Sequence, residues 1–131
     1  MNKFDKKLPE TTTYWQEGNL FFVKHTSFKV SMDEARGIGE LLVHAATRPG
    51  IKAVIIDSRD AKGVWAQEIN EIWAESSSMS DQIGHIKFVT LANSVTAAMQ
   101  INRLARNNGW GHNTKGFYSD MNDEVQAFIE A

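Results

Sequence analysis

The chain has 131 residues, of which 42% are hydrophobic and 23% are charged, and its formal net charge is -2. The length is typical of a single domain, and the composition is that of a globular protein rather than a disordered chain. The small negative charge, without a basic stripe, argues against nucleic-acid binding. The chain contains no cysteine, which excludes disulfides, thiolate metal sites and cysteine nucleophiles.

No apolar run in the sequence approaches the length of about 20 residues needed to cross a bilayer. The first ten residues are polar and lack the apolar segment of a signal peptide. These features predict a cytoplasmic protein. We expect residues 1–10 to form a polar arm and residues 11–131 to form one domain.

A β-hairpin is predicted at the start of this domain. Residues 11–15 are β-branched or aromatic and residues 20–23 are apolar, and both compositions are typical of strands. Between them, Gly18 and Asn19 tolerate the positive φ angles of a tight turn.

A helix is predicted to begin after the hairpin, at Ser31. Ser31 and Glu34 have the spacing of a capping box, in which each side chain satisfies a free backbone N–H at the helix start. Apolar residues then recur at helical spacing up to Ala45, and Pro49 and Gly50 end the helix. The apolar run at 53–56 suits a strand that is covered on both faces.

The rest of the chain alternates between predicted helices and strands. These are a second helix from about residue 64, a strand at 86–91, a third helix capped by Ser94, a short strand at 117–118 and a last helix capped by Ser119 or Asp120. The resulting order, β-β-α-β-α-β-α-β-α, is typical of an α/β protein with a mixed, mostly parallel sheet and helices packed on it.

A candidate binding site follows the strand at 53–57. In α/β sheets, ligands gather beyond the carboxyl ends of parallel strands, where this chain has Asp57, Ser58, Arg59 and Asp60. One interpretation is a site for a small anionic ligand or a partner carboxylate, held by Arg59, Ser58 and the N-terminus of the second helix. The other interpretation is a polar loop with an internal Asp–Arg pair.

Asn93, Ser94 and Trp65 extend the candidate site. If the strands that end at 57 and 91 are neighbours, Asn93 and Ser94 lie beside the first loop, and Ser94 serves as a helix cap or as a ligand contact. Trp65 could cover a ligand or a partner surface. Trp110, which lies between two glycines, could contact a partner or cover a helix end.

The sequence lacks the motifs of common catalytic and cofactor sites. None of the four histidines lies three or four residues from another histidine, the spacing of a helical His–His metal pair. The G-x-S-x-G elbow and the glycine-rich phosphate motifs are also absent. We therefore expect no metal and no cofactor. Asp57, Asp60 and His112 are the only candidates that the pattern offers to an enzyme.

The order of elements, the length and the closing helix resemble the SpoIIAA-like fold of the STAS family (sulfate transporter and anti-sigma-factor antagonist), especially its stand-alone, Sec14-like bacterial members. The matching segments are Ile55-Ile56-Asp57, the strand at 86–91, Phe117-Tyr118-Ser119-Asp120, and Glu124, Ala127, Phe128 and Ile129 of the last helix. The family's phosphorylatable Asp-Ser-x-Gly turn is absent, because Ser58 follows the strand directly, several residues too early.

Two functions from different classes are compatible with these observations. The first, which the resemblance implies, is a non-enzymatic interaction or regulatory module for an unknown protein partner. A homodimer could also form through the edge of the hairpin. The second is a Sec14-like carrier of a lipid or another small molecule, which needs an apolar cavity on the order of a few hundred Å³.

Overall fold

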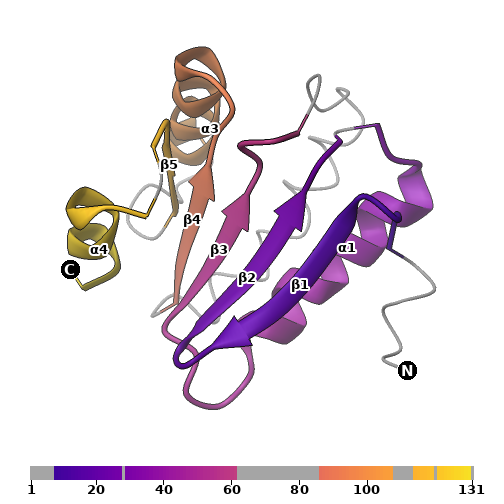
Figure 1. The fold of residues 1–131 in the computed structure, drawn as a ribbon, viewed down its shortest axis with the longest axis horizontal. Helices are drawn as coiled ribbons and strands as arrows, with labels where there is room; N and C mark the ends of the chain where they lie inside the picture. The colour runs from indigo at the N-terminus through magenta and orange to yellow at the C-terminus, as the bar shows by residue number, and fades with distance from the viewer. Residues whose placement is uncertain (1–7, 28, 62–85, 108–113, 120, 131) are drawn as a thin grey trace.

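The five strands that the computed structural model describes form one mixed sheet, in which each strand lies beside its neighbour in sequence (Figure 1). The structure describes residues 8–27, 29–61, 86–107, 114–119 and 121–130. The strands are β1 (Thr12–Glu17), β2 (Leu20–His25), β3 (Ala53–Asp57), β4 (Lys87–Leu91) and β5 (Thr114–Phe117). β1 is antiparallel to β2 and the remaining pairs are parallel, which confirms the predicted mixed, mostly parallel sheet.

The opening hairpin forms as predicted, with strands longer than the sequence indicated. Glu17 pairs with Leu20 across a two-residue turn, and Gly18 in that turn has a φ angle of 59°, which glycine adopts without strain because it lacks a Cβ atom. The rings of Trp15 and Phe22 stack across the two strands with their centroids 5.3 Å apart. β1 is an edge strand of the described sheet, and self-association through this edge stays a prediction.

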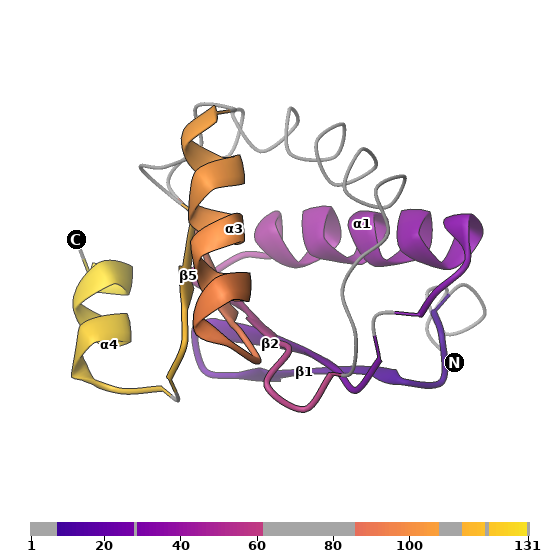
Figure 2. The same ribbon diagram turned by 90° about the horizontal axis from the view of Figure 1, so that it is seen from above.

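The described helices cover both faces of the sheet. α1 (Met32–Ala46) and α3 (Val95–Asn107) lie on one side in Figure 2, and α4 (Asp123–Glu130) lies beyond β5 on the other. Side chains alternate between the faces of a strand, so β3 supplies Val54 to the core beneath α1 and Ile55 to the core beneath α4.

Each face of the sheet has its own apolar core. The buried residues beneath α1 are Phe21, Val23, Leu41, Ala45, Ile51, Val54 and Ile86. Those beneath α4 are Ala53, Ile55, Val89, Leu91, Phe117, Val125 and Ile129. Ala53, Val54 and Ile55 have no exposed surface, which confirms that this apolar run is a strand covered on both faces.

The capping box of α1 is present as predicted. The Glu34 backbone N–H donates to the Ser31 hydroxyl at 3.1 Å, and the Ser31 N–H donates to the Glu34 carboxylate at 2.8 Å. Leu41 is completely buried and Leu42 is only partly buried. Both leucines contact the same core.

The closing strand and helix differ from the prediction at their boundaries. β5 begins at Thr114 and ends at Phe117, so Tyr118 lies outside the strand and is exposed. α4 begins at Asp123, and the Asn122 side chain accepts a hydrogen bond from the Val125 N–H at 3.0 Å. Asn122 is therefore the cap, in place of Ser119 or Asp120, since asparagine caps helices as well as serine does.

The predicted second helix, from about residue 64, lies outside the described residues, as do Trp65, Trp110 and His112. Leu8, near the end of the expected N-terminal arm, packs against the core beneath α1. Within the described part of the chain, no helix has the length and apolar character needed to cross a membrane.

Asn102 of α3 holds the outer edge of β5. Its side-chain amide donates to the Gly116 carbonyl at 3.1 Å and accepts from the Gly116 N–H at 2.9 Å, so one side chain satisfies the same two groups that a further strand would bond. Gly116 allows this approach because a Cβ atom there would lie 3.1 Å from Ile101 Cγ2 and 3.3 Å from the Ala98 carbonyl oxygen. These contacts fix the position of α3 on the sheet.

Replacing Asn102 by Ala should lower the free energy of unfolding by roughly 2 kcal/mol, because two buried backbone groups lose their partners. Chemical denaturation followed by circular dichroism measures this change. Gln100→Ala, at an exposed position of the same helix, is the control and should change stability by less than about 0.5 kcal/mol. Equal effects of the two substitutions would contradict the role assigned to Asn102.

Candidate functional site

The carboxyl ends of the parallel strands meet at one edge of the sheet, where the sequence placed its candidate site. Lys24 lies opposite Asp57, and Asp57 lies opposite Leu91. The loop after β3 begins at Ser58, whose backbone N–H donates to the Leu91 carbonyl at 2.9 Å. The loops that follow β3 and β4 are therefore adjacent, as the sequence analysis required.

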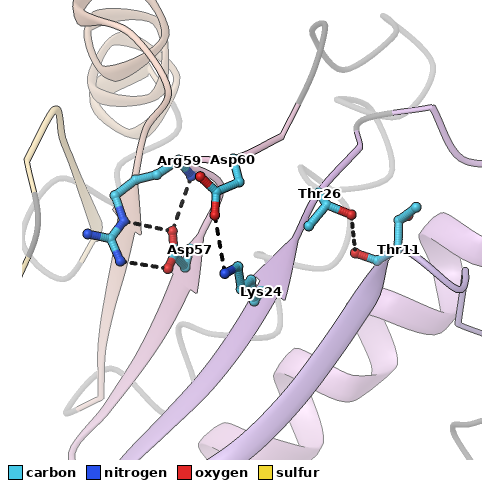
Figure 3. A network of polar contacts seen from close by, with 6 residues as sticks. All are labelled: Thr11, Lys24, Thr26, Asp57, Arg59 and Asp60. Carbon is cyan, nitrogen blue, oxygen red and sulfur yellow. Dashed lines mark hydrogen bonds and ion pairs between the residues drawn. The ribbon is translucent and has the colours of Figure 1, made fainter.

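Asp57 and Arg59 form a bidentate ion pair within the first loop (Figure 3). Arg59 Nε donates to Asp57 Oδ1 at 3.0 Å and Nη2 donates to Oδ2 at 2.8 Å. The Arg59 backbone N–H also donates to Oδ1, at 3.1 Å. The hydrogen bonds from Arg59 hold the pKa of the Asp57 carboxyl below its ordinary value, although burial of the carboxyl acts in the opposite direction.

This pair is the internal Asp–Arg contact that the second interpretation of the loop required. Asp57 is buried, whereas the Arg59 side chain remains partly exposed. The bidentate geometry is among the stronger forms of a charged hydrogen bond. It stabilises the first turn of the loop and leaves a positively charged group at the surface beside it.

A second charged contact lies next to the first. Lys24 Nζ is 3.2 Å from Asp60 Oδ2, and the side chains of both residues are substantially exposed. Figure 3 shows the pair beside Asp57 and Arg59, at the ends of β2 and β3. The same view shows the Thr26 hydroxyl donating to the Thr11 carbonyl, which ties the end of β2 to the chain just before β1.

Asn93 joins the second loop to the first. Its side-chain amide donates to the Ala61 carbonyl at 2.8 Å, and the Ala61 N–H donates to the Ser58 carbonyl at 3.1 Å. Ser58 and Ala61 are both buried. Asn93 therefore supports the backbone of the loop that follows β3.

Ser94 is the cap of α3. Its hydroxyl accepts a hydrogen bond from the Ala97 N–H at 3.0 Å, and its carbonyl accepts from the Ala98 N–H at 3.1 Å. Of the two roles that the sequence suggested for Ser94, a helix cap or a ligand contact, the structure shows the helix cap.

His25 is a buried titratable group near the candidate site that the sequence analysis did not single out. It is almost fully buried at the end of β2, and its Nδ1 atom lies 2.9 Å from the Thr12 hydroxyl. Burial lowers the pKa of His25 to about 4, and the negative charge of Asp57 acts in the opposite direction. The alternation of buried residues at 21, 23 and 25 is the sequence signal that could have placed this histidine in the interior.

Three large apolar side chains are exposed near this edge of the sheet. Val95 is 56% exposed, Met99 65% and Tyr118 60%. Val95 and Met99 lie one turn apart in the first half of α3, directly after Asn93 and Ser94, and Tyr118 follows the carboxyl end of β5. Val95 and Met99 are apolar positions of α3, but their exposure depends on how the helix lies on the sheet, which spacing alone does not show.

The structure brings together six of the seven predicted site residues: Asp57, Ser58, Arg59, Asp60, Asn93 and Ser94. Trp65 lies outside the described residues, and so does His112, the third residue suggested for an enzyme. Among the described residues, no group of three or more His, Asp or Glu side chains is arranged to hold a metal ion.

A scan against protein-family models finds no match, and a search of curated proteins also finds none. Two solved structures of DspI from Pseudomonas aeruginosa align with 66% of this chain at 10% identity and a TM-score of 0.42. The alignments span 40% and 43% of the two DspI chains, less than half of their length. A similarity of this size carries no argument about function.

The burial of neutral His25 predicts a loss of stability in mild acid. Below pH 6.5 His25 binds a proton in the unfolded chain, whereas in the folded chain it stays neutral down to about pH 4. The free energy of unfolding therefore falls by roughly 3 kcal/mol as the pH is lowered across this window. Asp57 adds a further loss of stability only below this pH window, because its pKa in the folded chain is lowered from 3.8 and the carboxylate is protonated there. Urea denaturation at several pH values should show a smaller slope for His25→Gln than for the wild type, and parallel curves would contradict this account.

Proposed function

We propose that the chain is a non-enzymatic, STAS-like interaction module that binds a protein partner at the carboxyl edge of its sheet. The observation that carries the proposal is the exposure of Val95, Met99 and Tyr118 beside hydrogen-bonded loops. Exposed apolar side chains next to a polar surface are typical of protein interfaces.

The loops at this edge offer a pre-organised surface to a partner. The bidentate Asp57–Arg59 pair, the Asn93–Ala61 hydrogen bond and the Ser94 cap use side chains of the chain itself to fix the backbone. A surface that is already ordered loses less conformational entropy when it binds. The partly exposed charges of Arg59 and Asp60 would then form the polar rim around the apolar side chains.

The internal pairing of Asp57 with Arg59 supports binding over catalysis. A general acid or base works best when its pKa lies near the working pH, whereas Arg59 moves the pKa of Asp57 down, away from neutrality. Asp60 is held by Lys24 at the surface. Both described carboxylates that the sequence analysis offered to an enzyme are therefore engaged in ion pairs.

The carrier of a lipid or another small molecule stays a prediction. It requires a cavity near Arg59 and Trp65, and Trp65 lies outside the described residues. The described cores beneath α1 and α4 are built from side chains that are almost fully buried, which favours the interaction module.

A cross-linking experiment tests the proposal directly. Because the chain contains no cysteine, Met99→Cys provides a single thiol for a photoactivatable maleimide. In an extract of the cells that make the protein, we expect one cross-linked partner, and we expect Tyr118→Cys to trap the same protein.

Arg36→Cys, at an exposed position of α1, is the matched control and should not trap that partner. Excess wild-type protein should compete with the cross-link, and Val95→Glu should compete poorly, because a charge replaces an apolar contact. The proposal fails if all three thiols trap the same proteins, or if Val95→Glu competes as well as the wild type.

A further inference from the structure

One flank of α3 combines exposed apolar and basic side chains. Val95 and Met99 are the most exposed described hydrophobic residues of this helix, Arg103 lies one turn beyond Met99, and Arg106 lies one turn further. Both arginines are exposed. We refer to these four residues, Val95, Met99, Arg103 and Arg106, as the α3 stripe.

The packing of α3 leaves this stripe free to face solvent. Ala98 and Ala105 are buried and Asn102 bonds the backbone of Gly116, so these residues form the side of the helix that faces the sheet. At 100° per residue, Val95, Met99 and Arg106 fall together on the flank beside Asn102, and Arg103 lies slightly further round. Since Asn102 reaches the outer edge of β5, the stripe lies along that edge.

The charge of α3 is of one sign. The helix from Val95 to Asn107 contains Arg103 and Arg106 and no acidic residue. Within the described part of the chain, neither arginine has an ion pair, in contrast to Arg59. The whole chain has a net charge of -2, so the positive charge of the stripe is a local feature.

We propose that the α3 stripe docks an acidic amphipathic helix of a protein partner. Val95 and Met99 would contact the apolar ridge of that helix, and Arg103 and Arg106 would pair with carboxylates along its side. An amphipathic helix lies in such a surface through apolar anchors spaced one turn apart, and methionine adapts to ridges of different shape. This inference rests on the proposed function and names its partner class.

The α3 stripe is less suited to the two other anionic partners, a membrane surface and a nucleic acid. Membrane attachment by basic residues uses clusters of about four to eight Lys or Arg, and the stripe has two. Nucleic-acid binding needs a broader basic footprint, which a chain of net charge -2 lacks. Two cations next to two apolar side chains match a helix with one acidic edge.

The test uses a fluorescent synthetic peptide of about 18 residues, with leucines at helical spacing and glutamates along one flank of that ridge. Fluorescence anisotropy measures its binding to the full chain at ~50 mM and ~300 mM salt. We expect saturable binding that weakens with salt. A matched peptide with lysines in place of the glutamates should bind at least tenfold more weakly. The net negative charge of the chain cannot produce this preference.

Variants assign the binding to the stripe. The double substitution Arg103→Glu and Arg106→Glu should weaken binding at least tenfold. The double substitution Arg103→Lys and Arg106→Lys should keep most of the wild-type affinity, because it keeps both positive charges. Met99→Gln should weaken binding by loss of apolar contact. Arg36→Glu, the same charge reversal at an exposed site on α1, is the control and should leave binding within about twofold of the wild type. Circular dichroism confirms that each variant is folded.

The inference is overturned if the glutamate and lysine peptides bind equally, if the wild type does not bind, or if Arg36→Glu weakens binding as much as the double substitution. Binding to vesicles with anionic phosphatidylserine or to an oligonucleotide, without binding to the peptide, would also overturn it. If the peptide fails while the Met99→Cys cross-link succeeds, the acidic partner class is wrong and the proposed function stands. If both fail, the proposed function is wrong as well.

Discussion

The burial of β3 on both faces is the constraint on which the rest of the structure depends. Val54 enters the core beneath α1 and Ile55 the core beneath α4, while β2 and β4 bond both edges of the strand. Asp57 ends the strand, still buried, and an unpaired carboxylate there would be costly. Arg59 removes this problem within two residues by closing a bidentate pair. The first turn of the candidate site is thus a direct consequence of where the core ends.

The candidate site lies at the carboxyl ends of the parallel strands, where the loops after β3 and β4 reach the surface. Parallel pairing brings the loops after β3 and β4 together. The side chains of Asn93 and Ser94 form hydrogen bonds with backbone groups of the first loop and of α3, and so fix the backbone there. Asn102 in turn sets α3 against β5 through Gly116. A helix positioned so firmly displays Val95 and Met99 at fixed places, which supports a role in recognition.

Short-range features of the sequence predicted much of the fold. The parts of the candidate site that depend on contacts between distant residues could not be predicted in the same way. The Ser31–Glu34 box, the Gly18 turn and the apolar run at 53–56 each act within a few residues, and all three predictions are confirmed. The adjacency of Asn93 to the first loop followed from parallel order. The Asn102–Gly116 contact joins residues 14 apart, and the exposure of Met99 depends on that contact. The exposure of Met99 could therefore not be read from spacing alone, whereas the two-residue alternation of β2 could have placed His25 in the interior.

Native mass spectrometry of the protein purified from the cells that make it tests the central claim most directly, because it reports bound partners and retained small molecules together. An interaction module should appear as the bare chain, as a homo-oligomer or as a complex with a protein, with no added mass of small-molecule size. A stoichiometric small-molecule adduct that survives gentle desolvation and is displaced only on unfolding would contradict the account and favour a carrier.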